Sequence, residues 1–98
     1  MTTQLPTLAE IQQDTHRLGE RQGWADKDLA TRALHLISEV GELADELLSF
    51  QDGGGNADQV AAEMYDVIWN VCDLGRLLGI DLDRAAERKA NENRERTW

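Results

Sequence analysis

The sequence has 98 residues, a formal net charge of −9 and a single cysteine, Cys72. A chain of this length forms one domain over residues 1–98, and the acidity argues against a protein that binds nucleic-acid polymers or anionic membranes. One cysteine cannot build a disulfide framework, and no apolar run reaches transmembrane length, so we expect a soluble cytoplasmic protein. A small anionic substrate held through metal ions stays compatible with the charge.

The first half of the chain predicts two helices. Residues 1–6 form a flexible arm, and Thr7 opens a capping box for a helix over 8–23. A second helix is expected over 27–50, with Asp26 as its N-cap.

The second half begins with a breaker and then predicts two more helices. The glycine-rich stretch 51–55, QDGGG, forms a loop, and Asn56 caps a helix over 57–78. Asp81 caps a fourth helix over 82–95. No stretch alternates as a strand would, and the helices follow one another closely. We therefore predict an all-α fold, a compact four-helix bundle, and we expect so short a helical chain to bury its remaining apolar surface in an oligomer.

Carboxylates follow one stripe of the second predicted helix, beside its apolar face. Glu39, Glu42 and Glu46 lie three and four residues apart on this stripe. Like charges at that spacing repel each other by a few tenths of a kcal/mol per pair. A cation bound between them would reverse the cost, because hard cations such as Mg²⁺ take oxygen ligands. Gly41 in the same helix is either tolerated or allows a neighbouring helix or ligand to approach.

The third predicted helix places Glu63 within its apolar arc and Asp66 at the edge of that arc. A carboxylate facing a core is costly unless it is paired or metal-bound. The two helices would build one acidic pocket if they packed together. Asn70 is then either a hydrogen-bonding partner of this pocket or a residue of the helix interface, and Asp73 is expected on the surface.

The order and spacing of these residues resemble a known family. The two acidic pairs are similar to the metal-binding signature of the MazG-like, all-α nucleoside triphosphate pyrophosphohydrolases. The basic end of the chain is similar to the small members that act on deoxycytidine triphosphate and its modified relatives. The residues that carry the resemblance are Glu39, Glu42, Glu63 and Asp66 in the acidic pairs, and Lys89, Asn93, Arg94 and Arg96 near the C-terminus.

The resemblance implies Mg²⁺-dependent cleavage between the α- and β-phosphates, which yields a nucleoside monophosphate and pyrophosphate. It implies that the two acidic pairs bind the metal, and we expect Glu42 to orient or deprotonate the attacking water. Many members carry a Glu where this chain has Ser38. The expected metal ligands are Glu39, Glu42, Glu63 and Asp66.

The resemblance also implies a dimer or tetramer of helical bundles, with sites assembled near subunit contacts, and it implies residues that contact the substrate. Lys89, Asn93 and Arg96 are expected at the phosphates. Trp24 and His16 are the candidates for holding the base, by analogy with early aromatic residues of small members.

Two other classes of protein fit the same sequence. One is a helical bundle that binds a nucleotide or metal without turnover, a reading to which Ser38 gives weight. The other is an oligomeric interaction protein whose acidic stripes face solvent. A di-iron bundle is disfavoured, because neither His16 nor His35 lies three residues after a Glu.

Overall fold

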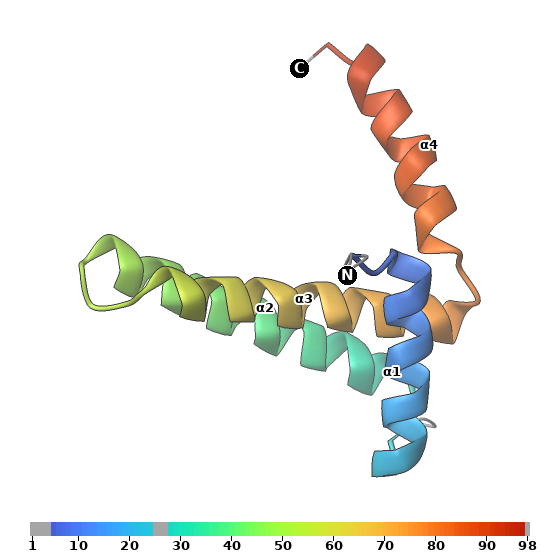
Figure 1. Cartoon of the computed structure of the whole chain (residues 1–98), viewed down its shortest axis with the longest axis horizontal. Coiled ribbons are helices and arrows are strands. Elements are labelled where there is room, and N and C mark those ends of the chain that lie inside the picture. Colours follow the sequence, from blue (N-terminus) through green and yellow to red (C-terminus); the bar gives the residue numbers. More distant parts are fainter. Residues whose placement is uncertain (1–4, 25–27, 98) are drawn as a thin grey trace, which may run out of the picture.

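The computed structural model describes residues 5–24 and 28–97, and all regular structure within these ranges is helical (Figure 1). The prediction of an all-α chain with four helices is confirmed. None of the helices in these ranges is both long enough and apolar enough to span a membrane. The helices are α1 (Leu8–Gln22), α2 (Leu29–Gln51), α3 (Ala57–Leu78) and α4 (Leu82–Glu95).

Side-chain caps start the helices, mostly where the sequence predicts them. Thr7 accepts a hydrogen bond from the Glu10 backbone N–H at 3.1 Å and completes the capping box of α1. Asn56 and Asp81 cap α3 and α4, because their side chains also accept backbone N–H groups of the first helical turn. The predicted N-cap of α2, Asp26, is wrong. Asp28 is the N-cap, and its side chain accepts a hydrogen bond from the backbone N–H of Thr31 at 2.7 Å.

The helix α2 therefore begins two residues after the predicted start, and Asp26 itself lies outside the described residues. At their C-termini α1 and α3 end on Gly23 and Gly79, with φ of 82° and 69°. These left-handed conformations favour glycine and stop both helices.

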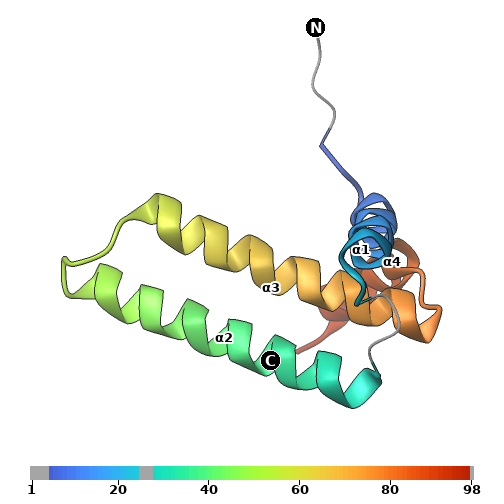
Figure 2. The same cartoon turned by 90° about the horizontal axis from the view of Figure 1, so that it is seen from below.

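The helices α2 and α3 form a long antiparallel hairpin, and α1 crosses α3 near the end opposite the hairpin loop (Figure 2). At this crossing a side chain on Gly75 would lie 2.8 Å from the Gln12 amide nitrogen. The Gln12 amide donates to the Ile80 carbonyl at 2.8 Å and accepts from the Leu82 N–H at 3.4 Å. Gln12 therefore joins α1 to the connection that leads into α4.

The first turn of α4 is also fixed to α1. The carboxylate of Asp83 accepts the backbone N–H groups of Leu8 and Ala9, both at 3.1 Å. An anion is favourable here because the first N–H groups of a helix lack partners within the helix.

A single chain does not form the compact bundle that the sequence predicts. Beyond its first turns α4 diverges from the hairpin (Figure 1), and the radius of gyration is 15.6 Å. A compact chain of this length has about 13 Å. Ile11, Val60 and Cys72 are the buried hydrophobic residues in the described part of the chain. Local patterns predicted the helices correctly, but many of the large apolar side chains in the described residues are exposed.

Candidate metal and nucleotide site

The hairpin brings the two predicted acidic pairs together between α2 and α3. One carboxylate oxygen from each of Glu39, Glu63 and Asp66 lies within 4.8 Å of the others. Glu42 is not one of the three residues of this acidic cluster, but its carboxylate is close enough to raise the pKa of Glu63. Glu46 is close enough to act on Glu63 electrostatically.

Two oxygens of the acidic cluster lack a partner. Glu39 Oε2 and Glu63 Oε2 are buried, and neither has a hydrogen-bond partner among the described residues. Buried polar atoms are nearly always satisfied by a partner, and an unsatisfied carboxylate oxygen is costly. A set made only of carboxylate oxygens suits a hard divalent cation such as Mg²⁺. The residues present therefore fit the metal that the resemblance implies.

The same crowding changes how these groups titrate. Burial, and then the neighbouring carboxylates of Glu42 and Asp66, raise the pKa of both Glu39 and Glu63. His35 lies 3.6 Å from Glu39 and opposes the shift there. Protons and a cation therefore compete for the same oxygens.

A pocket of about 300 Å³ opens beside the acidic cluster, and Glu39 and Asp66 belong to both. Trp24 and Trp69 meet in it edge to face, with ring centroids 6.4 Å apart. The Trp24 indole N–H is buried and has no acceptor within the described part of the chain. An aromatic wall with an unused donor suits a planar, polar ligand such as a nucleobase. The residues that line this aromatic pocket are Leu18, Trp24, Arg32, His35, Glu39, Asp66, Trp69 and Asn70.

A buried ion network lies behind the aromatic pocket. Arg32 donates to the fully buried Asp73 at 2.7 Å, and Arg76 donates to the other oxygen of Asp73 at 2.8 Å. Arg32 also donates to Asn70 at 3.1 Å, and Asn70 donates to the backbone carbonyl of Asp66 at 2.7 Å. The network therefore ties α2 to α3 and reaches the backbone of the acidic cluster.

This network shows that the expected surface position of Asp73 is wrong, and it decides between the two roles that were open for Asn70. Asp73 was expected on the surface, but it is completely buried and paired with two arginines. Asn70 is a hydrogen-bonding partner at the site, one of the two alternatives that its sequence position left open. One feature of the sequence could have indicated a special role for Arg32, because Arg32 is the only Lys or Arg in α2. A wheel of one helix cannot show which residue of another helix faces it.

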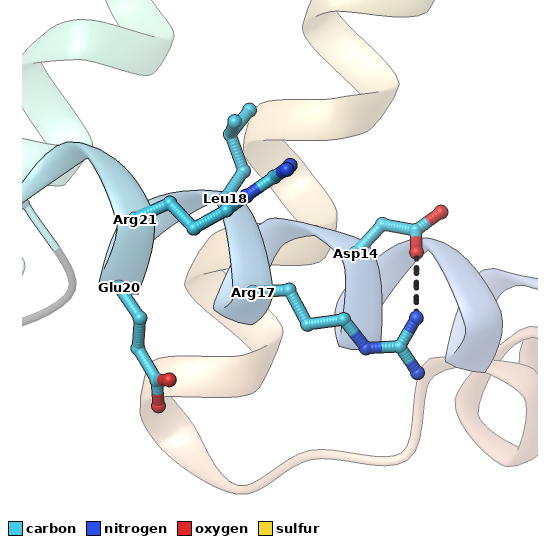
Figure 3. Close-up of a pocket in the computed structure, with 5 residues that line it drawn as sticks. All are labelled: Asp14, Arg17, Leu18, Glu20 and Arg21. Carbon is cyan, nitrogen blue, oxygen red and sulfur yellow. Dashed lines mark hydrogen bonds and ion pairs between the residues drawn. The ribbon is translucent and has the colours of Figure 1, made fainter.

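A larger hollow of the surface lies elsewhere, along α1. It has a volume of about 600 Å³, and Asp14, Arg17, Glu20 and Arg21 surround it. Figure 3 shows these side chains spreading along the helix surface, with Asp14 and Arg17 paired at 3.5 Å. The two acidic and two basic side chains around this hollow balance in charge and do not point toward a common centre. We therefore do not take it as the functional site, although its volume is larger.

A family model describes most of this chain. The model of the MazG nucleotide pyrophosphohydrolase domain matches residues 27–97. The chain belongs to this family. The match contains α2, α3 and α4, and therefore the acidic cluster and the basic end. Comparison with curated proteins and with solved structures found no match.

The basic end of the MazG domain lies apart from the acidic cluster in one chain. Lys89 and Asn93 are on α4 and Arg96 follows its last residue, and α4 packs against α1 and diverges from the hairpin (Figure 1). Lys89 lies 3.6 Å from Glu92. Asn93 Oδ1 is buried without a partner among the described residues.

The two expected base-contacting residues lie in different places. Trp24 lines the aromatic pocket, whereas His16 lies on the exposed side of α1 and pairs with Glu20 at 2.6 Å. Trp69 lines the pocket as well. The helical wheel of α3 places Trp69 opposite the apolar arc, a position compatible with either a subunit interface or a base-stacking surface.

Proposed function

We propose that the protein is a Mg²⁺-dependent nucleoside triphosphate pyrophosphohydrolase. It cleaves between the α- and β-phosphates and releases a nucleoside monophosphate and pyrophosphate. The observation that carries the proposal is the convergence of Glu39, Glu63 and Asp66 within 4.8 Å, with two oxygens unpartnered, in a chain of the MazG family. A triphosphate is anionic, so an acidic pocket accepts it only together with cations.

The proposed reaction is displacement at the α-phosphorus. The oxygen of a water molecule bonds to this phosphorus, the bond to the oxygen bridging the α- and β-phosphates breaks, and pyrophosphate leaves with the electron pair. Glu39, Glu42, Glu63 and Asp66 hold Mg²⁺. When bound, Mg²⁺ supplies charge neutralisation at the phosphates and Lewis acidity toward the water. Glu42 orients the water and takes its proton.

The aromatic pocket holds the base. Trp24 and Trp69 contact its ring, and the unused Trp24 N–H donates to a ring carbonyl or nitrogen. Trp69 takes precedence over His16, because His16 does not line the pocket. The resemblance to small family members makes deoxycytidine triphosphate and modified nucleotides the first substrates to test.

Lys89, Asn93 and Arg96 contact the phosphates from a second copy of the chain. Within one chain α4 leads away from the acidic cluster, so a dimer or tetramer is needed to bring these residues to it. Their donors then neutralise the leaving pyrophosphate, for which the forked guanidinium of Arg96 is well suited.

The test is product analysis with a panel of canonical and modified nucleoside triphosphates, with Mg²⁺ and with chelator. Glu42→Gln and Glu63→Gln are expected to abolish turnover, whereas Glu87→Gln removes an exposed carboxylate of α4 and is expected to leave turnover unchanged. A nucleoside diphosphate with orthophosphate as products would show that the wrong bond is assigned. Metal-dependent binding without any product would favour the non-catalytic module that Ser38 suggests.

A further inference from the structure

Arg32 lies where the buried ion network meets the aromatic pocket. Its side chain is 9% exposed and lines the pocket. Its Nε donates to Asp73, and its Nη2 donates to Asn70. The central carbon of its guanidinium lies over the Trp69 ring, 6.0 Å from the ring centroid. One side chain therefore contacts the buried carboxylate of the network and two residues of the pocket wall.

Charge neutrality does not explain why Arg32 is buried. Arg76 donates to Oδ1 of Asp73 through both Nε and Nη2, at 3.0 and 2.8 Å. This arginine alone would balance the carboxylate, so the network holds two cations for one anion. Removing a second cation from water costs free energy, and apolar side chains often replace buried ion pairs without loss of stability. The contacts with the pocket are what distinguish Arg32, since Arg76 is not among the residues that line it.

Arg32 determines which way the amide of Asn70 points. An arginine side chain has donors and no acceptor, so Oδ1 of Asn70 faces it and Nδ2 faces away. Nδ2 donates to the backbone carbonyl of Asp66 at 2.7 Å. Partners at both ends hold the amide in one orientation. Asn70 lines the pocket, so this part of the pocket wall is fixed before a ligand arrives.

Trp69 is held from two directions. The guanidinium of Arg32 lies over its ring, and the ring of Trp24 meets it at an interplanar angle of 80°. A cation over an indole face is attracted by the negative charge of the ring, and edge-to-face packing of two indoles is also favourable. An aromatic side chain that is already fixed loses little freedom when a planar ligand stacks on it, and such preorganisation raises affinity.

We propose that Arg32 is a positioning residue that holds the aromatic pocket in its ligand-binding form before a ligand arrives. Its planar guanidinium binds Asp73 and Asn70 through two of its nitrogens and covers Trp69 with its face. A lysine keeps the charge but has no plane, so it can pair with Asp73 without fixing the pocket wall. The expected effect on substrate binding rests on the proposed function, whereas the expected effect on the two tryptophans does not.

The test compares Arg32→Lys with Arg76→Lys, a matched control. Both substitutions keep a positive charge beside Asp73, but Arg76 does not line the pocket. The first measurement is circular dichroism of the ligand-free protein, because two indole rings held close together give a coupled band of two signs. Trp24→Phe removes one ring of the pair and identifies this band.

We expect wild type and Arg76→Lys to show the tryptophan band and Arg32→Lys to lose most of it. Helix content and the mass measured by light scattering are expected to stay as in wild type. Arg32→Met fills the same space without a buried charge and gives the same comparison if Arg32→Lys does not fold. A ligand-free wild type without the band, or Arg32 variants that keep the band in full, overturns the proposal.

The second measurement is steady-state turnover, with Mg²⁺, of the triphosphate that product analysis identifies. Arg32→Lys is expected to raise KM by about tenfold, the order of one base–aromatic stacking contact, with little change in kcat because the metal ligands are kept. Arg76→Lys is expected to keep the KM of wild type. A loss confined to kcat, or equal KM values in the two variants, contradicts the positioning role. Absence of turnover in wild type counts against the proposed function, and the tryptophan band then decides the role of Arg32.

Discussion

The two sides of the α2–α3 hairpin are incomplete for opposite reasons. On the acidic side, one buried oxygen each of Glu39 and Glu63 has no hydrogen-bond partner among the described residues. On the apolar side, large hydrophobic side chains such as Ile37 and Met64 are exposed. A cation at the first and a second chain at the second would complete both. The comparison teaches that one amphipathic hairpin can keep an acidic cluster and an exposed apolar surface on separate sides.

The largest expected effect joins the two sides in one experiment. Glu63→Gln and Lys89→Ala are each expected to be inactive, because one lacks a metal ligand and the other a phosphate contact. Coexpressed in equal amounts, they are expected to recover about a quarter of wild-type activity, since half of the dimers are mixed and each mixed dimer has one intact site of two. The measurement is pyrophosphate release. No recovery from mixed oligomers of proven composition would place all site residues in one chain.

The next effect concerns the buried network behind the acidic side. Asp73→Asn leaves Arg32 and Arg76 without their carboxylate and is expected to lower the free energy of unfolding by about 3–5 kcal/mol. Asp14→Asn removes an exposed partner of Arg17, and about 0–1 kcal/mol is expected. Denaturant unfolding at one protein concentration compares the two variants. Equal losses would contradict the structural role of Asp73.

The acidic side is also expected to respond to pH in a definite direction. The pKa values of Glu39 and Glu63 are raised in the folded chain, so the folded state holds these protons more tightly than the unfolded state. Their contribution to stability is full below about pH 4.3, the ordinary glutamate pKa, and is lost as pH rises through the raised values.

Melting temperatures in chelator between pH 4 and 8 measure this loss. Glu63→Gln removes one of the two groups, so its melting temperature is expected to fall less with pH than that of wild type. Glu87→Gln changes an exposed carboxylate and is expected to follow wild type. Mg²⁺ at pH 8 is expected to restore stability in wild type and less in Glu63→Gln. Parallel pH curves for wild type and Glu63→Gln would exclude Glu63 as a source of the effect.

The smallest effect tests the outer side of α2. Apart from neighbouring residues of its own helix, no described residue has an atom within 4 Å of where a Gly41 side chain would begin, so no contact between described parts of the chain requires glycine there. Gly41→Ala is then expected to raise the free energy of unfolding by about 0.5–1 kcal/mol, through helix propensity alone. A loss of stability or of oligomer mass in the same unfolding and scattering measurements would show that a second chain packs closely against Gly41.

The sequence predicted what local chemistry determines. The helix starts predicted from the caps Thr7, Asn56 and Asp81 are confirmed. They could be predicted because a capping side chain binds a backbone N–H only two or three residues later in the sequence. The predicted cap Asp26 was wrong because Asp28, two residues later, is the same capping residue type and local pattern does not separate the two.

Relations between helices were harder to predict. The meeting of Glu39, Glu63 and Asp66 was predicted only on the condition that the two helices pack together, because each helix carried acidic residues whose cost was unexplained. Asp73 did not, since its burial depends on Arg32, which lies 41 residues earlier in another helix. The open shape also escaped prediction, because periodicity shows which face of a helix is apolar but not which chain will cover it.

The contacts at the start of α1 have a consequence for truncation and domain exchange. The family match begins at residue 27, whereas the residues that hold α4, Gln12 and the N-terminus of α1 at Leu8, precede it. A chain cut to the matched stretch would keep its carboxylates but lose Trp24 and the fixed direction of α4. The N-terminal segment thus sets the direction of α4 and forms one wall of the aromatic pocket. Replacing this segment by another sequence would change both features and leave the acidic cluster of α2 and α3 unaltered.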